Sequence, residues 1–135
     1  MAKCWWWTAD GWRGDQGAQA LSDDIKLVGL GDAEARSPED GLMRQVLAYT
    51  EKLMVVRHVM QKGWVGARHS HPHEQLVYVI HGHIRFIGGG KTMEARSGDS
   101  FVVPGGVEHE ARALEESEVL DVFAPYREDY AEVSA

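Results

Sequence analysis

Several side chains that commonly bind metals lie close together in one short stretch of the chain, His69–Ser70–His71–Pro72–His73–Glu74–Gln75. Alternate side chains of an extended chain point the same way, so His69, His71 and Gln75 are predicted to share one face. A second segment contributes one more imidazole, His109, after a turn rich in proline and glycine. Three imidazoles and one amide oxygen, if they converge, would bind a divalent metal and leave coordination positions open.

The residue types do not identify the metal. Imidazole binds several divalent transition metals, so we expect one ion chosen from Ni, Zn, Fe or Mn. Because the Gln75 side chain is neutral, the centre would keep the whole charge of the ion, which makes it a stronger Lewis acid and a better partner for an anionic oxygen. Octahedral geometry with these protein ligands would leave two neighbouring positions for a chelating substrate.

Other polar residues near this stretch are expected to lie outside the metal centre. Glu74 has the opposite strand parity to the predicted ligands and should point away from them. His73 shares their parity but is expected at the rim of the site. His58, His81 and His83 are interpreted as surface histidines or as hydrogen-bonded structural ones.

A second group of functional candidates lies on the last predicted strand, Val119–Phe123. Asp121 and Phe123 are two residues apart and therefore share a face. An aspartate inside an apolar strand is costly to bury unless it is paired. Two interpretations stay open: either Arg112 or Arg127 forms a structural ion pair with Asp121, or Asp121 faces a cavity and moves a proton as general acid or base. In the second case Arg127 would bind a carboxylate through two hydrogen bonds.

The elements that must position these residues are short β-strands. From Gly41 onward, strand-like segments alternate with glycine-rich turns, a pattern that favours a barrel or sandwich over βαβ units. The predicted strands are Leu42–Leu47, Lys52–Met60, Leu76–Ile80, Ile84–Ile87, Lys91–Glu94, Ser100–Val103 and Val119–Phe123.

The first forty residues differ from the rest of the chain. Four tryptophans near the start are followed by glycine and aspartate typical of loops. Ile25–Leu30 is expected to form one short strand, and Ser37–Asp40 a turn. The tryptophans indicate a plug over one barrel end or a strand exchanged with a second subunit. A sugar-stacking platform is a less favoured alternative, because exposed tryptophan is costly in a monomer.

Length, charge and cysteine content limit the class of protein. A chain of 135 residues suits one domain, and we expect an extension at 1–40, a barrel at 41–130 and a loose tail at 131–135. Fourteen basic and twenty-one acidic residues give a net charge of −7, which disfavours nucleic acids and anionic membranes as partners. Cys4 is the single cysteine, which suits the reducing cytoplasm. No signal peptide or membrane helix is predicted.

The two histidine segments resemble the paired motifs of the cupin superfamily. The first motif runs Gly, five residues, His-x-His, three or four residues, then Glu or Gln, and the second runs Gly, five residues, Pro-x-Gly, two residues, His. The matching positions are Gly63, His69, His71 and Gln75 in the first motif and Gly98, Pro104, Gly106 and His109 in the second. The resemblance implies an all-β fold, the double-stranded β-helix or RmlC-like jelly-roll barrel, with metal ligands pointing into its mouth.

A narrower resemblance, over roughly Gly41 to Tyr130, is to the KdgF group of pectin-degradation cupins. It is carried by His-Ser-His-Pro-His-Glu-Gln and by Val-Leu-Asp-Val-Phe, which a proline and Arg-Glu-Asp-Tyr follow. The resemblance implies conversion of 4,5-unsaturated uronates, which are small anionic sugars, to linear keto forms. It assigns the metal to His69, His71, Gln75 and His109, and site roles to Asp121, Phe123 and Arg127. The tryptophan-rich start, His81 and Tyr126 depart from the group's pattern.

Two rival functions fit the same residues. A three-histidine centre with open positions also suits O₂, so a non-haem iron dioxygenase is an alternative enzyme. A ligand-binding or sensor cupin is the non-enzymatic alternative. By analogy with other small cupins, the protein is expected to form a homodimer by exchange of the N-terminal segment.

Overall fold

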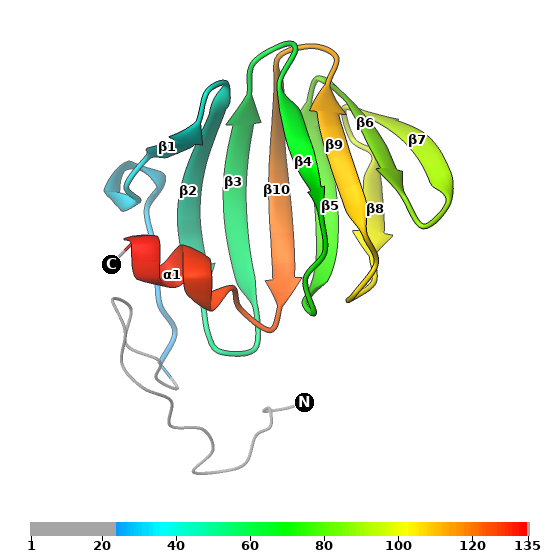
Figure 1. Cartoon of the computed structure of the whole chain (residues 1–135). Helices are drawn as coiled ribbons and strands as arrows, with labels where there is room; N and C mark the ends of the chain where they lie inside the picture. Colours follow the sequence, from blue (N-terminus) through cyan, green and yellow to red (C-terminus); the bar gives the residue numbers. More distant parts are fainter. Residues whose placement is uncertain (1–23, 135) are drawn as a thin grey trace.

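Two antiparallel β-sheets face each other in this protein (Figure 1). The structure is a computed structural model that describes residues 24–134. In spatial order the larger sheet contains β1 (Arg36–Glu39), β2 (Leu42–Tyr49), β3 (Met54–Met60), β10 (Ser117–Ala124), β5 (Glu74–His81) and β8 (Ser100–Val103). The smaller sheet contains β4 (Val65–His69), β9 (His109–Ala113), β6 (His83–Gly88) and β7 (Lys91–Arg96). This arrangement confirms the predicted all-β jelly-roll fold.

The strands follow from alternation of buried and exposed side chains. On β3 every second residue from Met54 to Met60 is buried, and on β10 the same holds from Ser117 to Phe123. The buried apolar residues form one cluster around Val79 and a second around Phe123. Titratable residues occupy two of the inward positions, His58 on β3 and Asp121 on β10. The fold therefore places two titratable groups where a simple core would have aliphatic ones.

Two expectations for the segment before β2 were wrong. Residues 25–29 form no regular element, and a short 3-10 helix, η1, covers Leu30–Asp32. The side chains of Ile25 and Leu27 are fully exposed, so their alternation has no sheet to pack against. The turn expected at Ser37–Asp40 is mostly strand β1, which pairs with β2 at the sheet edge. An edge strand tolerates Pro38 because no neighbour needs its missing N–H.

The chain end is also more ordered than expected. In place of a loose tail from Ala131, helix α1 covers Glu128–Ser134 and lies beside β2 (Figure 1). Ala131 is buried in the cluster around Phe123, with Tyr130 packed against the same cluster. The described residues contain no helix long and apolar enough to cross a membrane. The predictions for Cys4 and the early tryptophans lie outside the described residues.

The two histidine-bearing loops are hydrogen-bonded to each other. The N–H of Gly106 donates to the His71 carbonyl at 2.8 Å, and the N–H of Gly105 donates to the Glu74 carboxylate at 2.9 Å. Gly105 lies so close to the first loop that a Cβ atom on it would be 2.3 Å from the Pro72 carbonyl oxygen. The Pro-Gly-Gly turn is thus shaped to seat one loop against the other.

Replacing Gly105 with alanine is expected to destabilise the fold by about 1–3 kcal/mol, because the added methyl group must displace backbone of the neighbouring loop. The free energy of unfolding, measured by chemical denaturation, tests this. Gly31→Ala is the matched control, since no atom lies within 4 Å of the added Cβ. Equal stability of the two variants would contradict the close-packing argument.

Candidate metal centre and its pocket

Three histidines, two at strand ends and one in a loop, converge between the sheets. His69 ends β4 and His109 begins β9, and the two residues are directly paired across these strands. His71 follows in the loop to β5. One ring nitrogen from each of the three lies within 4.8 Å of the others. The structure thus brings together three of the four predicted metal ligands as a group that could hold a metal ion.

The backbone fixes which nitrogen of each ring is available to a metal. The Nδ1 atoms of His69, His71 and His109 lie 2.9, 3.1 and 2.8 Å from the carbonyl oxygens of Ala67, His73 and Val107. A carbonyl can only accept, so each Nδ1 must carry the hydrogen. Each Nε2 then presents a lone pair, the form in which neutral imidazole binds a metal.

Gln75, the fourth predicted ligand, directs its amide oxygen at this group. Its Nε2 donates to Asp121 Oδ1 at 2.8 Å, which leaves Oε1 at 3.0 Å from Nε2 of His71. Both atoms of the second contact are acceptors when His71 is neutral, so the contact is unfavourable unless a cation lies beside both. In an octahedral site with bonds of about 2.1 Å, neighbouring ligand atoms are about 3.0 Å apart. The 3.0 Å between Gln75 Oε1 and His71 Nε2 matches that spacing.

The electrostatics of the site favour neutral imidazoles. Burial lowers the pKa of His71, and the charge of Arg127 lowers it further. Burial likewise lowers the pKa of His109, whose Nε2 is buried and has no hydrogen-bond partner among the described residues. A buried lone pair without a donor is costly, and a metal ion would satisfy it. These residues therefore fit a divalent metal.

Asp121 lies in the pocket but not in the ion pair that was one of its two interpretations. Its Oδ2 is 2.6 Å from Nδ1 of His58, and its Oδ1 accepts from Gln75. Arg112 instead contacts Glu110, and Arg127 donates to Asp129 at 2.9 and 3.1 Å. The prediction of an Asp121–arginine pair is wrong, because two nearer donors already occupy both carboxylate oxygens.

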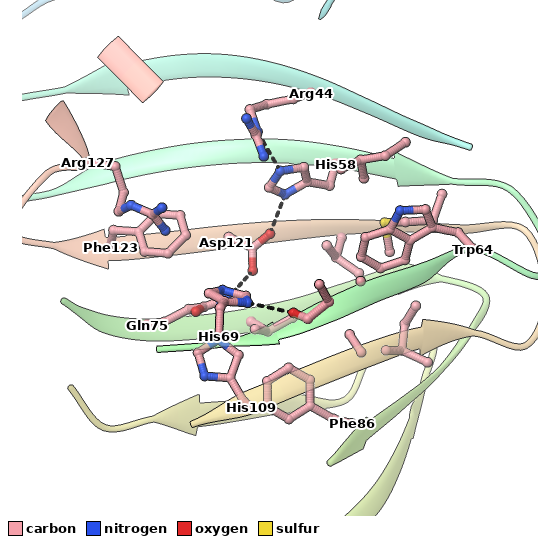
Figure 2. A pocket seen from close by; sticks show the side chains of 18 of the residues that line it. Arg44, His58, Trp64, His69, Gln75, Phe86, His109, Asp121, Phe123 and Arg127 are labelled. Carbon is pink, nitrogen blue, oxygen red and sulfur yellow. Dashed lines mark hydrogen bonds and ion pairs between the residues drawn. The ribbon is translucent and has the colours of Figure 1, made fainter. Parts of the chain in front are cut away.

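The pocket that His69 and His109 help to line has a volume of about 290 Å³. Asp121, Phe123 and Arg127 all line it, with the Arg127 guanidinium carbon 5.0 Å from the Phe123 ring centre. The lining also includes the aromatic side chains of Phe86, Phe101 and Trp64. Figure 2 shows Arg127 and Phe123 at one end of the pocket and Trp64 at the other. The pocket thus suits a small ligand with a polar edge and a less polar face.

The histidines and the glutamate assigned to other places do lie outside the three-histidine group. His83 contacts Glu94 at 2.8 Å and His81 contacts Glu118 at 3.4 Å, both away from the pocket lining. Glu74 points to the Gly105 turn, as its parity indicated. His58 is hydrogen-bonded, as one interpretation held, yet it also lines the pocket.

Most of the pocket lining was not identified from the sequence as part of a site. The polar residues among those missed include Arg44, His58 and Tyr130. His58 shares its strand parity with Met54, Val56 and Met60, and this parity could have indicated an inward position. Tyr130 enters the pocket on α1, and no periodic signal in the sequence marks that helix as part of the site.

The fold and the paired histidine loops define a class of protein. The sequence profile described as "Cupin domain" matches residues 56–123, and the chain belongs to the cupin family. Among characterised proteins it is similar to the pectin degradation protein KdgF of Dickeya dadantii (strain 3937), with 32% identity over 93 residues. That alignment covers 67% of this chain and 84% of the relative.

Two solved structures are similar along most of their length. KdgF from Halomonas sp. is 34% identical, with a TM-score of 0.74, and the match covers 78% of this chain and 99% of that one. An RmlC-like cupin from Shewanella frigidimarina NCIMB 400 is 33% identical, with a TM-score of 0.75 and coverage of 79% and 96%. The resemblance to the KdgF group therefore extends to the fold.

The metal-free protein is expected to lose stability as the pH falls from about 7.5 to about 5.5. Unfolded histidines take up protons near their ordinary pKa of about 6.5, whereas burial lowers the folded-state pKa of His71, His73 and His109. The unfolded state then binds more protons, and acid favours it. Chemical denaturation across this range measures the slope, which should be shallower for His109→Asn. A stability that rises toward acid pH would contradict the buried neutral imidazoles.

Proposed function

We propose that this KdgF-like cupin is a metal-dependent enzyme that opens and tautomerises 4,5-unsaturated uronates. In this proposal His69, His71, Gln75 and His109 hold one divalent transition metal. The observation that carries it is the Gln75 amide, whose oxygen faces the histidine group while its N–H₂ binds Asp121. One side chain thereby joins a candidate metal centre to a candidate proton carrier. The similarity to two KdgF proteins supports the choice of substrate.

The proposed reaction is an isomerisation that needs no co-reactant. Asp121 takes the proton of the anomeric hydroxyl while the bond between the ring oxygen and the anomeric carbon breaks. The anomeric carbon becomes an aldehyde, and the ring oxygen stays on C5 as an enol or enolate. Return of a proton to C4 then gives the C5 ketone, so atoms and electrons balance. A bound divalent metal would act as a Lewis acid toward substrate oxygens.

Asp121 is suited to begin this reaction as a base. Two N–H donors, from His58 and Gln75, face its two oxygens and hold the carboxylate in one orientation. Each carboxylate oxygen retains a lone pair for a third donor, which the substrate hydroxyl would be. Proton transfer by such a positioned group contributes about 10²–10⁴-fold to a rate.

Arg127 and Phe123 would bind and orient the substrate. The Arg127 side chain is buried in the pocket wall, and two of its nitrogens donate to Asp129, a residue with 61% of its side chain exposed. A substrate carboxylate would replace part of that partly hydrated contact with a two-point hydrogen bond. Phe123 is 1% exposed and shapes the wall beside it. Local positive charge of this kind would offset the net charge of −7.

Purified protein is expected to contain one divalent transition metal per chain and to remove the absorbance of the conjugated double bond of an unsaturated uronate. Chelation should abolish this activity and re-addition of metal should restore it. Asp121→Asn should keep the metal and lower turnover by about 10²–10⁴-fold. Glu116→Gln makes the same chemical change at an exposed residue and serves as control.

Three results would overturn the proposal. Full turnover in Asp121→Asn would return Asp121 to a structural role. Iron-dependent oxygen uptake that Ni or Zn cannot restore would indicate a dioxygenase. Tight uronate binding with no product would indicate a ligand-binding or sensor cupin.

We also propose that the protein works as a cytoplasmic homodimer. Support comes from an apolar patch on the outer face of the larger sheet, where Leu76, Tyr78, Ile80 and Val102 are 41%, 43%, 38% and 57% exposed. Exposed apolar patches of this kind mark interaction surfaces. The single cysteine, Cys4, suits a reducing compartment.

Tyr78→Glu is expected to convert a dimer to monomers, because a charge would be buried at the interface. Light scattering coupled to size-exclusion chromatography measures the mass, with the same substitution at exposed Met93, on the edge strand β7, as control. A wild-type monomer would contradict the proposal, as would an unchanged dimer in Tyr78→Glu.

A further inference from the structure

We infer that Arg44 and His58 are positioning residues. In this inference Arg44 fixes the tautomer of His58, and His58 in turn holds Asp121 as an oriented proton acceptor. The consequence for turnover rests on the function proposed above, whereas the hydrogen-bond arrangement stands on the geometry alone. Neither residue would touch the reacting atoms.

A row of hydrogen bonds crosses four neighbouring strands of the larger sheet (Figure 2). Nε of Arg44 on β2 lies 2.9 Å from Nε2 of His58 on β3. Nδ1 of His58 lies 2.6 Å from Oδ2 of Asp121 on β10, whose Oδ1 accepts from Gln75 on β5. The row therefore ends at a proposed metal ligand.

The strand register explains why these side chains meet. Arg44 is directly opposite His58, and His58 is opposite Val119, two residues before Asp121. Asp121 and Gln75 are related by a similar diagonal, because Gln75 is opposite Phe123. Directly opposite and diagonal neighbours on one face are the pairs that interact across a sheet.

The chemistry of these groups determines which atom donates and which accepts in each hydrogen bond of the row. A guanidinium can only donate, so Nε2 of His58 must accept and cannot carry a proton at the same time. The hydrogen of the neutral ring is then on Nδ1, where it is donated to Asp121. Asp121 thus accepts at both oxygens, and the Gln75 amide is fixed with its nitrogen toward Asp121 and its oxygen toward His71.

The outer end of the row is held by aromatic packing. The guanidinium carbon of Arg44 lies 3.8 Å from the centre of the Tyr130 ring, and that of Arg127 lies 4.0 Å from the same centre. His58 and Asp121 are only 8% and 5% exposed, so water cannot readily replace a lost donor. Removing one partner would leave a buried carboxylate underpaired.

Four variants separate positioning from a general effect on the fold. His58→Phe removes both contacts and keeps an aromatic ring, while His58→Asn retains an N–H near the position of Nδ1. Arg44→Met removes the donor that fixes the tautomer. His83→Phe is the matched control, because His83 has a comparable 2.8 Å contact to Glu94 outside the pocket.

Three measurements are made on the full chain. Long-range proton–nitrogen NMR, on zinc-loaded and metal-free protein, reports which nitrogen of His58 is protonated. Competition titration gives the zinc affinity, and steady-state kinetics with an unsaturated uronate give kcat and KM. We expect a proton on Nδ1 alone in the wild type and a proton on Nε2 in part of the Arg44→Met molecules.

His58→Phe is expected to lower kcat or zinc affinity by about 10–100-fold, the usual effect of losing a partner behind a metal site. His58→Asn should recover most of that loss, and His83→Phe should match the wild type. If His58→Phe does not fold, the other two variants still test the inference. His58→Asn must then have a higher kcat than Arg44→Met.

A proton on Nε2 in the wild type would overturn the inference, and so would His58→Phe behaving like His83→Phe in every measurement. These failures differ from failure of the proposed function. A protein with the expected tautomer and zinc affinities but no uronate turnover refutes only the function, whereas turnover with the wrong tautomer refutes only the positioning role.

Discussion

The site depends on the side-chain amide of Gln75, which donates hydrogen bonds through its nitrogen and accepts them through its oxygen. The Gln75 nitrogen must face Asp121, because a carboxylate accepts and cannot donate, and the oxygen must then face the histidines. The three imidazoles are oriented in the same manner by backbone carbonyls, so every ring directs a lone pair inward. Acceptors gathered around one point repel each other unless a cation is present. This arrangement is difficult to explain as a neutral hydrophobic core.

The two sheets contribute different parts of this arrangement. Hydrogen-bonded side chains from β2, β3, β10 and β5 form a polar row across the larger sheet, while the smaller sheet supplies His69 and His109 as a directly paired couple. The Gly105–Gly106 turn ties the two histidine loops together, so the separation of the sheets sets the spacing of the candidate ligands. Packing and chemistry are therefore specified by the same contacts.

Motif spacing carried most of what the sequence could predict. His69, His71 and His109 sit in motifs whose glycines and proline have local geometric reasons, so these motifs predicted both the strands and the grouping of the three imidazoles. Elements without such local constraints were predicted poorly. The alternation at 25–30 lacks a neighbouring strand, and α1 depends on burial of Ala131 against residues far away in the sequence.

The partners of Asp121 were hidden for a similar reason. Sequence logic pairs a buried acid with the nearest arginines, but the register of β3 and β10 places His58 diagonally across from it. Register is a property of the assembled sheet and cannot be read from either strand alone. Tyr130 was missed because the approach of α1 to β2 is tertiary. The candidate ligands could thus be predicted from local sequence motifs. The residues around them depend on tertiary contacts and could not.

The position of Tyr130 gives the end of the chain a part in the pocket. Its ring supports both Arg44 and Arg127, yet it lies in the first half of a helix only seven residues long. Trimming the chain back past this residue would remove the shared support of two guanidinium groups, while the strands of the described residues all precede the cut. Such a shortened protein would keep its sheets and lose the shape of its cationic wall. Shortening the chain would therefore impair ligand binding before it impaired folding.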